Sequence, residues 1–300
     1  MIELDGLSKR FGRIHAVEDL TCSIEAGVVT GFLGPNGAGK STTMRMILGL
    51  DRPSAGSATV MGRRYREHRY PLRTVGALLD ARQVHPHRTA RAHLHWIAAS
   101  NGLPRKRIDE VLDMVGLTEV AGNRAGTFSL GMSQRLGIAA ALLGDPPVLL
   151  FDEPVNGLDP DGIRWIRTLM RDLAEEGRTV FVSSHLLAEM AQTADRLLVI
   201  GRGRLIAATT VAEFVNRAGL DAVRVRTPQR DRLCEELTRA GLASTVEDSA
   251  VLVRGASTEQ VGELAARHGL TLHELSVARA SLEEAYMALT DEAVDFRAKR

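Results

Sequence analysis

Short runs of apolar residues alternate with helical patterns over the first two thirds of the chain. The runs with the character of β-strands are 28–33, 58–61, 75–79, 148–151, 179–184 and 196–200. Apolar positions that recur at helical spacing predict helices over 41–50, 161–176 and 186–193. Strands that alternate with helices predict an α/β fold with a largely parallel core sheet.

The strand pattern disappears between about residues 86 and 145. Three helical stretches fill this region, and glycines mark where they end. The pattern therefore predicts an all-helical subdomain inserted into the α/β domain.

A third pattern begins at about residue 216. It reads as a strand at 222–227, a helix at 230–241, a hairpin from 243–248 and 250–255, a helix at 257–269 and a strand at 270–276. The order β-α-β-β-α-β is typical of a small α+β domain of the ferredoxin-like type. A final helix is predicted over 281–290. We therefore expect two domains, 1–215 and 216–300.

Composition narrows the setting. Apolar residues make up 44% of the chain and charged residues 25%, with a formal net charge of +1, so nothing calls for nucleic acid as a partner. The two cysteines, Cys22 and Cys234, lie far apart, which favours a reducing compartment. No apolar stretch approaches the roughly 20 residues that span a bilayer, and the N-terminus does not read as a signal peptide. If the protein works at a membrane, we expect a separate chain to cross it.

The segment GPNGAGKST (34–42) follows a predicted strand, opens a predicted helix and fits the phosphate-loop pattern G-x-x-x-x-G-K-[ST]. Its glycines let backbone N–H groups turn toward phosphate oxygens, and the helix N-terminus adds partial positive charge. Lys40 is expected to reach the β- and γ-phosphates, and the Ser41 hydroxyl to bind Mg²⁺. The predicted nucleotide-binding residues here are Gly34, Pro35, Asn36, Gly37, Ala38, Gly39, Lys40, Ser41 and Thr42.

The strand at 148–151 is followed by two adjacent acids, Asp152 and Glu153. Neighbouring carboxylates at the end of a buried strand repel one another, so a cation is expected nearby. In a phosphate-loop fold, a strand beside the phosphate strand ends in an acid that holds Mg²⁺, and Asp152 fits that role. Glu153 would then face the γ-phosphate and polarise the attacking water.

Taken in order, these motifs resemble the ATP-binding subunits of ABC transporters over roughly residues 1–210. GPNGAGKST resembles Walker A, and VLLFDEP resembles Walker B with its catalytic glutamate, Glu153. NGLDP resembles the D-loop, which implies that Asp159 lies near a dimer interface. SSH resembles the switch region, which implies that His185 contacts the γ-phosphate and assists Glu153.

Two further matches concern nucleotide contacts. FSLGMSQR (128–135) resembles the ABC signature, which implies that Ser129 and Gly131 contact ATP bound to a partner subunit. Phe11 stands where the family has an aromatic that stacks on adenine. Each residue also has a structural interpretation: Phe11 as a core residue, Ser129 as a helix N-cap and His185 as a hydrogen-bonded strand-end histidine.

The chain departs from the family at two positions. Leu130 stands where the signature has glycine, and Asp80 stands where the family has the glutamine of the Q-loop. Asp80 could bind Mg²⁺ directly, and Gln83 is the alternative if the loop is shifted. Such departures, the C-terminal domain and the tail SLEEAYMAL resemble the daunorubicin-type drug-exporter branch (ABC-2 type).

Two other clusters are interpreted without a site. His85, His87, His93 and His95 lack a complete set of metal ligands at helical spacing, so a structural role is favoured. The basic segment 63–73 is interpreted as a solvated loop, because the chain as a whole is nearly neutral.

The resemblance implies a head-to-tail homodimer that uses ATP and Mg²⁺, with Lys40, Glu153 and His185 as the catalytic residues. It implies that ATP hydrolysis powers export of a small molecule through a separate permease, from the cytoplasmic face of the cell membrane. The alternatives are a soluble ABC-type ATPase switch in translation or DNA maintenance, and a module that binds ATP without cleaving it. The single cassette and the lack of a long heptad run favour the transporter.

Overall fold

A computed structural model describes residues 1–81, 84–217, 222–247, 249–278 and 280–290 of the chain. It divides into a first compact unit over Met1–Thr210 and a second that begins at Val211. The boundary expected after residue 215 falls inside α8 (Val211–Arg217), which belongs to the second unit. Each unit is described below by itself.

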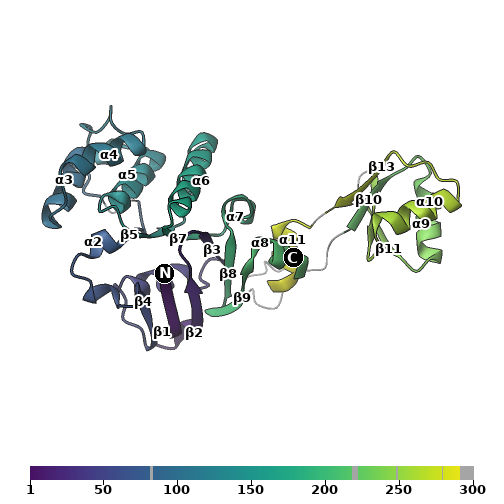
Figure 1. Cartoon of the computed structure of the whole chain (residues 1–300), viewed down its shortest axis with the longest axis horizontal. Helices are drawn as coiled ribbons and strands as arrows, with labels where there is room; N and C mark the ends of the chain where they lie inside the picture. Colours follow the sequence, from purple (N-terminus) through teal and green to yellow (C-terminus); the bar gives the residue numbers. More distant parts are fainter. Residues whose placement is uncertain (82–83, 218–221, 248, 279, 291–300) are drawn as a thin grey trace. The chain divides into compact units, whose positions relative to one another are not determined.

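The first unit is built around a six-stranded sheet with the order β5-β6-β7-β3-β8-β9 (Figure 1). Neighbouring strands from β5 to β8 are parallel, and β9 pairs antiparallel with β8. Because β3, β6 and β7 are buried along their whole length, they read as continuous apolar runs in the sequence. The prediction of a largely parallel core sheet is confirmed. The strands are β3 (Val29–Leu33), β5 (Val75–Leu78), β6 (Val148–Asp152), β7 (Thr179–Ser184), β8 (Arg196–Gly201) and β9 (Arg204–Thr210).

Helices connect the parallel strands close to the predicted positions. They are α1 (Lys40–Ile47), α6 (Pro160–Glu175) and α7 (Leu187–Thr193). Asp159 caps α6, since its carboxylate accepts a hydrogen bond of 2.7 Å from the Gly162 N–H, and Pro160 occupies the first turn. Ile166 and Met170 on α6 are buried, and charged residues cover its outer face.

A separate antiparallel sheet has the order β2-β1-β4. It contains β1 (Ile2–Phe11), β2 (Ile14–Ile24) and β4 (Ala55–Val60). The prediction that 58–61 belongs to the core sheet is wrong, because β4 pairs with β1. The run is short and apolar, so its pattern does not name its partner. Ile2 of β1 and Phe32 of β3 lie in one hydrophobic cluster, so the two sheets share a core.

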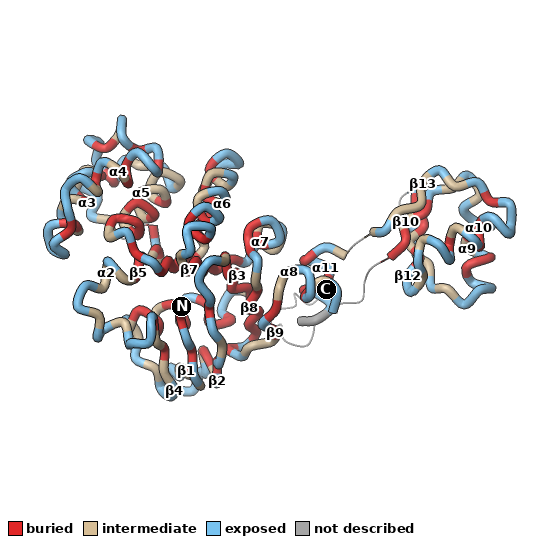
Figure 2. The backbone as a smooth tube through the Cα atoms, viewed as in Figure 1, coloured by how far each residue is buried: buried red, intermediate tan, exposed pale blue. Residues whose placement is uncertain are grey.

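The helical subdomain is present between β5 and β6, as predicted. It consists of α3 (Ala90–Ser100), α4 (Lys106–Met114), the 3₁₀ turn η2 (Ala125–Thr127) and α5 (Leu130–Leu142). Two short elements precede β5, namely the 3₁₀ turn η1 (Tyr65–Glu67) and α2 (Pro71–Thr74). In α3, α4 and α5 the buried residues face one another, and they include Leu94, Val111 and Leu136. Figure 2 shows the exposed residues on the outer surfaces of these helices.

The second unit contains a four-stranded antiparallel sheet with the order β11-β12-β10-β13. Its elements are β10 (Ala222–Arg226), α9 (Arg230–Arg239), β11 (Ala243–Glu247), β12 (Ala250–Arg254), α10 (Thr258–Arg267) and β13 (Glu274–Ala278). The predicted order β-α-β-β-α-β is therefore present. Val223 and Val225 of β10 form a buried core with Leu233 of α9 and Val261 of α10.

The same unit contains a helix pair. Helix α8 packs against α11 (Leu282–Thr290), where Phe214, Leu282 and Ala285 are buried. None of the helices that the structure describes is long and apolar enough to cross a membrane.

Candidate functional site at the phosphate loop

The loop from Gly34 to Gly39 joins β3 to α1, and two of its glycines are required by close backbone approach. A Cβ on Gly34 would lie 2.4 Å from the carbonyl oxygen of Ile200. A Cβ on Gly39 would lie 2.4 Å from the carbonyl oxygen of Ala16, and its φ of 107° is one that glycine adopts readily. The loop is thus held tightly while Asn36 and Gly37 at its tip remain exposed.

The ammonium group of Lys40 lies beneath this loop. Its Nζ donates hydrogen bonds to the carbonyl oxygens of Gly34 (2.6 Å) and Pro35 (3.4 Å), and it lies 3.7 Å from Oε1 of Glu153. Desolvation lowers the pKa of Lys40, while the carboxylates of Glu153 and Asp152 act in the opposite direction. The buried cation therefore has weak neutral partners that a more negative group can replace.

Ser41 and Thr42 occupy the first turn of α1, with Ser41 exposed and Thr42 half-buried. The helix is established at this point, because the N–H of Thr43 donates to the carbonyl oxygen of Gly39 (2.9 Å). The hydroxyl groups of the pair are therefore placed at the N-terminal end of the helix, next to the loop.

Asp152 ends β6 at the carboxyl edge of the core sheet and is buried. The strand is not beside the phosphate strand, as the sequence predicted, because β7 lies between β6 and β3. Ser183 of β7 fills this gap, and its hydroxyl donates a hydrogen bond to Oδ1 of Asp152. Sequence reasoning missed Ser183, although it stands in the SSH segment that drew attention to His185.

Glu153 has a left-handed backbone conformation with φ 51°. Its N–H donates to the carbonyl oxygen (3.2 Å) and the Oγ (3.1 Å) of Ser183, and its own carbonyl accepts from Nε2 of Gln134 (3.2 Å). A non-glycine residue in this region is strained, so these contacts hold the turn in place. The strain directs the side chain of Glu153 toward Lys40 and away from a regular strand path.

The carboxylate of Glu153 bridges two of the predicted catalytic residues. Its Oε2 lies 2.7 Å from Nδ1 of His185, while Oε1 faces Lys40. Glu153 is largely buried, at 19% exposure, and the imidazole of His185 is 41% exposed. The structure therefore brings Lys40, Asp152, Glu153 and His185 to one edge of the sheet. An acid beside a lysine and an imidazole can accept a proton from a water molecule.

Asp80 follows β5 and is exposed. Because β5 pairs with β6 in parallel, with Leu78 opposite Phe151, Asp80 lies at the same carboxyl edge as Asp152. Gln83, the alternative candidate for this position, lies outside the described residues.

The signature segment and the D-loop contact each other. Ser129 is the N-cap of α5, where its hydroxyl accepts from the N–H of Met132 (3.2 Å). A Cβ on Gly157 would lie 2.3 Å from the Leu130 side chain, and a Cβ on Gly131 would lie 3.0 Å from the carbonyl oxygen of Gly157. These residues and Asp159 form a group whose contacts differ from those of Lys40 and Glu153.

Phe11 ends β1 and is 48% exposed, so its interpretation as a core residue is wrong. The ammonium of Lys9 lies 4.8 Å from the centroid of its ring. The Phe11 ring therefore has a surface that is accessible to a flat ligand.

The family was examined against this geometry. A sequence model of the family described as "ABC transporter" matches residues 17–156. The uncharacterized ABC transporter ATP-binding protein YhcH of Bacillus subtilis (strain 168) is 35% identical over 295 residues, which cover 97% of this chain and 96% of that protein. The chain belongs to the ABC transporter ATP-binding proteins. Residues 221–283 match a domain of unknown function (DUF8746).

Two named relatives of this ABC protein are resistance or transport subunits. The daunorubicin/doxorubicin resistance ATP-binding protein DrrA of Streptomyces peucetius is 34% identical over 99% of this chain and 94% of that protein. The bacitracin transport ATP-binding protein BcrA of Bacillus licheniformis is 42% identical over 69% of this chain and 68% of that protein. The resemblance to the drug-exporter branch is confirmed.

Solved structures support the same fold. The structure of an ATP-binding subunit of an ABC transporter matches with a TM-score of 0.67 and 29% identity, over 79% of this chain and 99% of that chain. The ATP-binding cassette MJ0796, a dimer in a post-hydrolysis state bound to ADP and Pi, matches with a TM-score of 0.64 and 26% identity, over 70% and 98%. The predicted phosphate-loop ATPase fold of the first unit is confirmed.

Proposed function

We propose that this ATP-binding subunit hydrolyses ATP to power the export of a small molecule through a separate membrane permease. The observation that carries the proposal is the contact of Glu153 with both Lys40 and His185 at the end of the phosphate loop. The cargo class rests on likeness to DrrA and BcrA, whose names refer to daunorubicin or doxorubicin resistance and to bacitracin transport.

ATP binding would begin with exchange of the partners of Lys40. The carbonyl oxygens of Gly34 and Pro35 are neutral, so phosphate oxygens would form stronger, charge-assisted hydrogen bonds with Nζ. Backbone N–H groups of residues 36–42 would surround the same oxygens. The exposed ring of Phe11 would stack on adenine.

Mg²⁺ fits the oxygen ligands at this edge of the sheet. It prefers one or two carboxylates together with waters and substrate phosphates. Asp152 and the Ser41 hydroxyl would hold it, with Asp80 as a third ligand at the same edge. In the described residues no cluster of three or more His, Cys, Asp or Glu could bind a metal, which fits an ion held mainly by substrate and water. Mg²⁺ would offset the negative charge of the phosphates.

Hydrolysis would use Glu153 as the acceptor of a proton from the attacking water. His185 would orient its carboxylate through the 2.7 Å contact between Nδ1 and Oε2. Lys40 would stabilise charge on the γ-phosphate, because it already lies beside both the loop and the glutamate.

The second group of residues would act in a dimer. Leu130 is 41% exposed, and Ser129, Gly131 and Asp159 surround the same contact of the signature with the D-loop. In a head-to-tail homodimer this surface would cover the nucleotide of the partner subunit. The dimeric MJ0796 cassette supports such an arrangement. We place the subunit at the cytoplasmic face of the membrane, bound to its permease.

The proposal is tested by recovering partners from native host extract with the Glu153→Gln chain in the presence of ATP. The substitution should trap the closed dimer and retain weakly bound partners. Recovery of one integral membrane protein in stoichiometric amount would support the transporter. Recovery of ribosomes or DNA-processing proteins without a membrane protein would instead support the soluble switch.

A further inference from the structure

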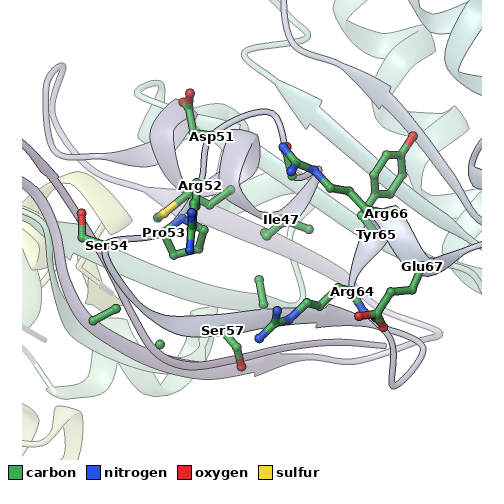
Figure 3. Close-up of a pocket in the computed structure, with 15 residues that line it drawn as sticks. Ile47, Asp51, Arg52, Pro53, Ser54, Ser57, Arg64, Tyr65, Arg66 and Glu67 are labelled. Carbon is green, nitrogen blue, oxygen red and sulfur yellow. Dashed lines mark hydrogen bonds between the residues drawn. The ribbon is translucent and has the colours of Figure 1, made fainter.

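A second cavity of the first unit lies away from the phosphate loop. It has a volume of about 530 Å³ and is enclosed by the C-terminal end of α1, the loop that follows, β4 and η1 (Figure 3). None of its lining residues belongs to the nucleotide site described above. A cavity of this size can hold a small organic molecule.

The floor of the cavity is apolar. Met46 and Ile47 from the end of α1 and Ala58 from β4 are all buried and belong to the main hydrophobic cluster. Tyr65 packs against this cluster from η1 and is half-buried. An apolar ligand body placed here would be removed from water over much of its surface.

The mouth of the cavity is cationic. Arg52 and Arg64 are exposed, and in Figure 3 both side chains point toward the space between α1 and β4. In the described part of the chain, neither guanidinium has an acidic partner. Two guanidinium groups without a counter-charge are a ready site for a planar anion, which they can bind in bidentate geometry.

The two acids of the lining are already engaged. Asp51 pairs with Arg45 at 2.7 Å, and the Glu67 carboxylate accepts from the N–H of Arg64 (3.3 Å). These charges would repel a group with several negative charges more strongly than a single carboxylate. The lining therefore favours a monoanion over a polyphosphate.

The carbonyl end of α1 works against an anion, because the helix dipole is negative there. Arg66 reduces this effect, since its Nη2 donates a hydrogen bond to the carbonyl oxygen of Gly49 at the end of the helix. With that carbonyl covered, the charges of Arg52 and Arg64 decide the sign of the potential at the mouth.

We propose that this cavity binds a small amphiphilic carboxylate. The apolar body of the ligand lies on Met46, Ile47 and Ala58, and its carboxylate lies between the guanidinium groups of Arg52 and Arg64. The site is independent of ATP hydrolysis, so its test does not depend on the function proposed above.

The test is a calorimetric titration of the full chain with octanoate, below the concentration at which octanoate forms micelles. Octylamine and inorganic phosphate serve as probes with the same apolar body and with charge alone. We expect octanoate to bind at one site, and neither of the other two to bind over the same concentration range. Addition of MgATP should leave the octanoate affinity unchanged, since the phosphate loop is elsewhere.

Variants then assign the site. Arg52→Ala combined with Arg64→Ala should weaken octanoate binding by at least about tenfold, because two charge-assisted contacts are lost. Arg52→Lys with Arg64→Lys should fall in between. Arg105→Ala is the matched control, because Arg105 is exposed and distant in sequence on the helical subdomain, and it should leave the affinity unchanged.

Four results would overturn the proposal. They are no binding of octanoate, equal binding of octylamine, displacement of octanoate by MgATP, and an unchanged affinity in the double alanine variant. All four substituted positions of the arginine variants are exposed, and melting temperatures near that of the wild type would verify that each variant is folded.

Discussion

The hydroxyl of Ser183 on β7 donates a hydrogen bond to the carboxylate of Asp152 on β6. Ser183 is fully buried, and its Oγ also accepts from the N–H of Glu153 (3.1 Å). One side chain thus orients the predicted Mg²⁺ ligand and supports the strained backbone of the predicted base. It does so from the strand that separates β6 from the phosphate strand.

Ser183→Ala should weaken the Mg²⁺ dependence of ATP hydrolysis. Groups that orient a metal ligand typically change metal affinity by about 10- to 100-fold, so we expect an increase of that size in the Mg²⁺ concentration for half-maximal activity. Nucleotide affinity without Mg²⁺ should not change. Ser183→Thr keeps the hydroxyl and should restore most of the Mg²⁺ response. Equal Mg²⁺ curves for the wild type and the alanine variant would rule out this positioning role.

Glu153→Gln should lower the turnover number for ATP by roughly 10²- to 10⁴-fold, the contribution typical of a general base. The amide has nearly the same shape as the carboxylate, so ATP should still bind. Steady-state phosphate release and equilibrium nucleotide binding measure the two effects. Glu175→Gln, at an exposed acid near the end of α6, is the control. Wild-type turnover in Glu153→Gln would show that another group accepts the proton.

His185→Ala should lower turnover through Glu153. The contact between Nδ1 and Oε2 is 2.7 Å, so the two residues act as a unit, and their effects should not add. We expect the double variant with Glu153→Gln to be no slower than Glu153→Gln alone. Multiplicative losses in that double variant would indicate that His185 acts by a separate route.

Lys40→Met should abolish nucleotide binding and also change how stability depends on pH. Burial lowers the pKa of Lys40 below the ordinary value of 10.5, so the unfolded chain binds more protons than the folded one in the interval between the two pKa values. Stability from this group therefore rises as the pH increases through that interval. In nucleotide-free protein, wild-type stability relative to Lys40→Met should increase as the pH approaches 10.5. A flat difference in chemical denaturation would contradict this.

Gly157→Ala should weaken ATP-dependent dimerisation with little effect on ATP binding by the monomer. Gly157 has φ 77°, and its added Cβ would lie 2.3 Å from Leu130, so the signature segment has to move. Gly177→Ala is a matched control, since Gly177 has φ 87° but no atom within 4 Å of the added Cβ. Both variants carry the backbone strain of roughly 1–2 kcal/mol, and only the first disturbs the proposed interface. Equal dimerisation of the two variants, measured by light scattering with Glu153→Gln, would remove the D-loop from the interface.

Much of the site could be predicted from local sequence. The phosphate loop is continuous, so Gly34, Gly39 and Lys40 were found together, and their close contacts follow from the requirement for residues without a Cβ. The acids after 148–151 were found because charge at the end of a buried strand is costly. The order of elements in the second unit was also predictable, because its amphipathic periods are regular.

Strand neighbours could not be read from these patterns. Apolar run 58–61 resembles a core strand, yet its partner is β1, and β7 lies between β6 and β3 because pairing depends on contacts far apart in the chain. The role of Ser183 follows from that order alone, since a serine in a buried strand carries no sign of what faces it. The local sequence determined which residues can hold a phosphate and a proton. Only the tertiary structure decided which of them meet, because strand order sets the distances between their side chains.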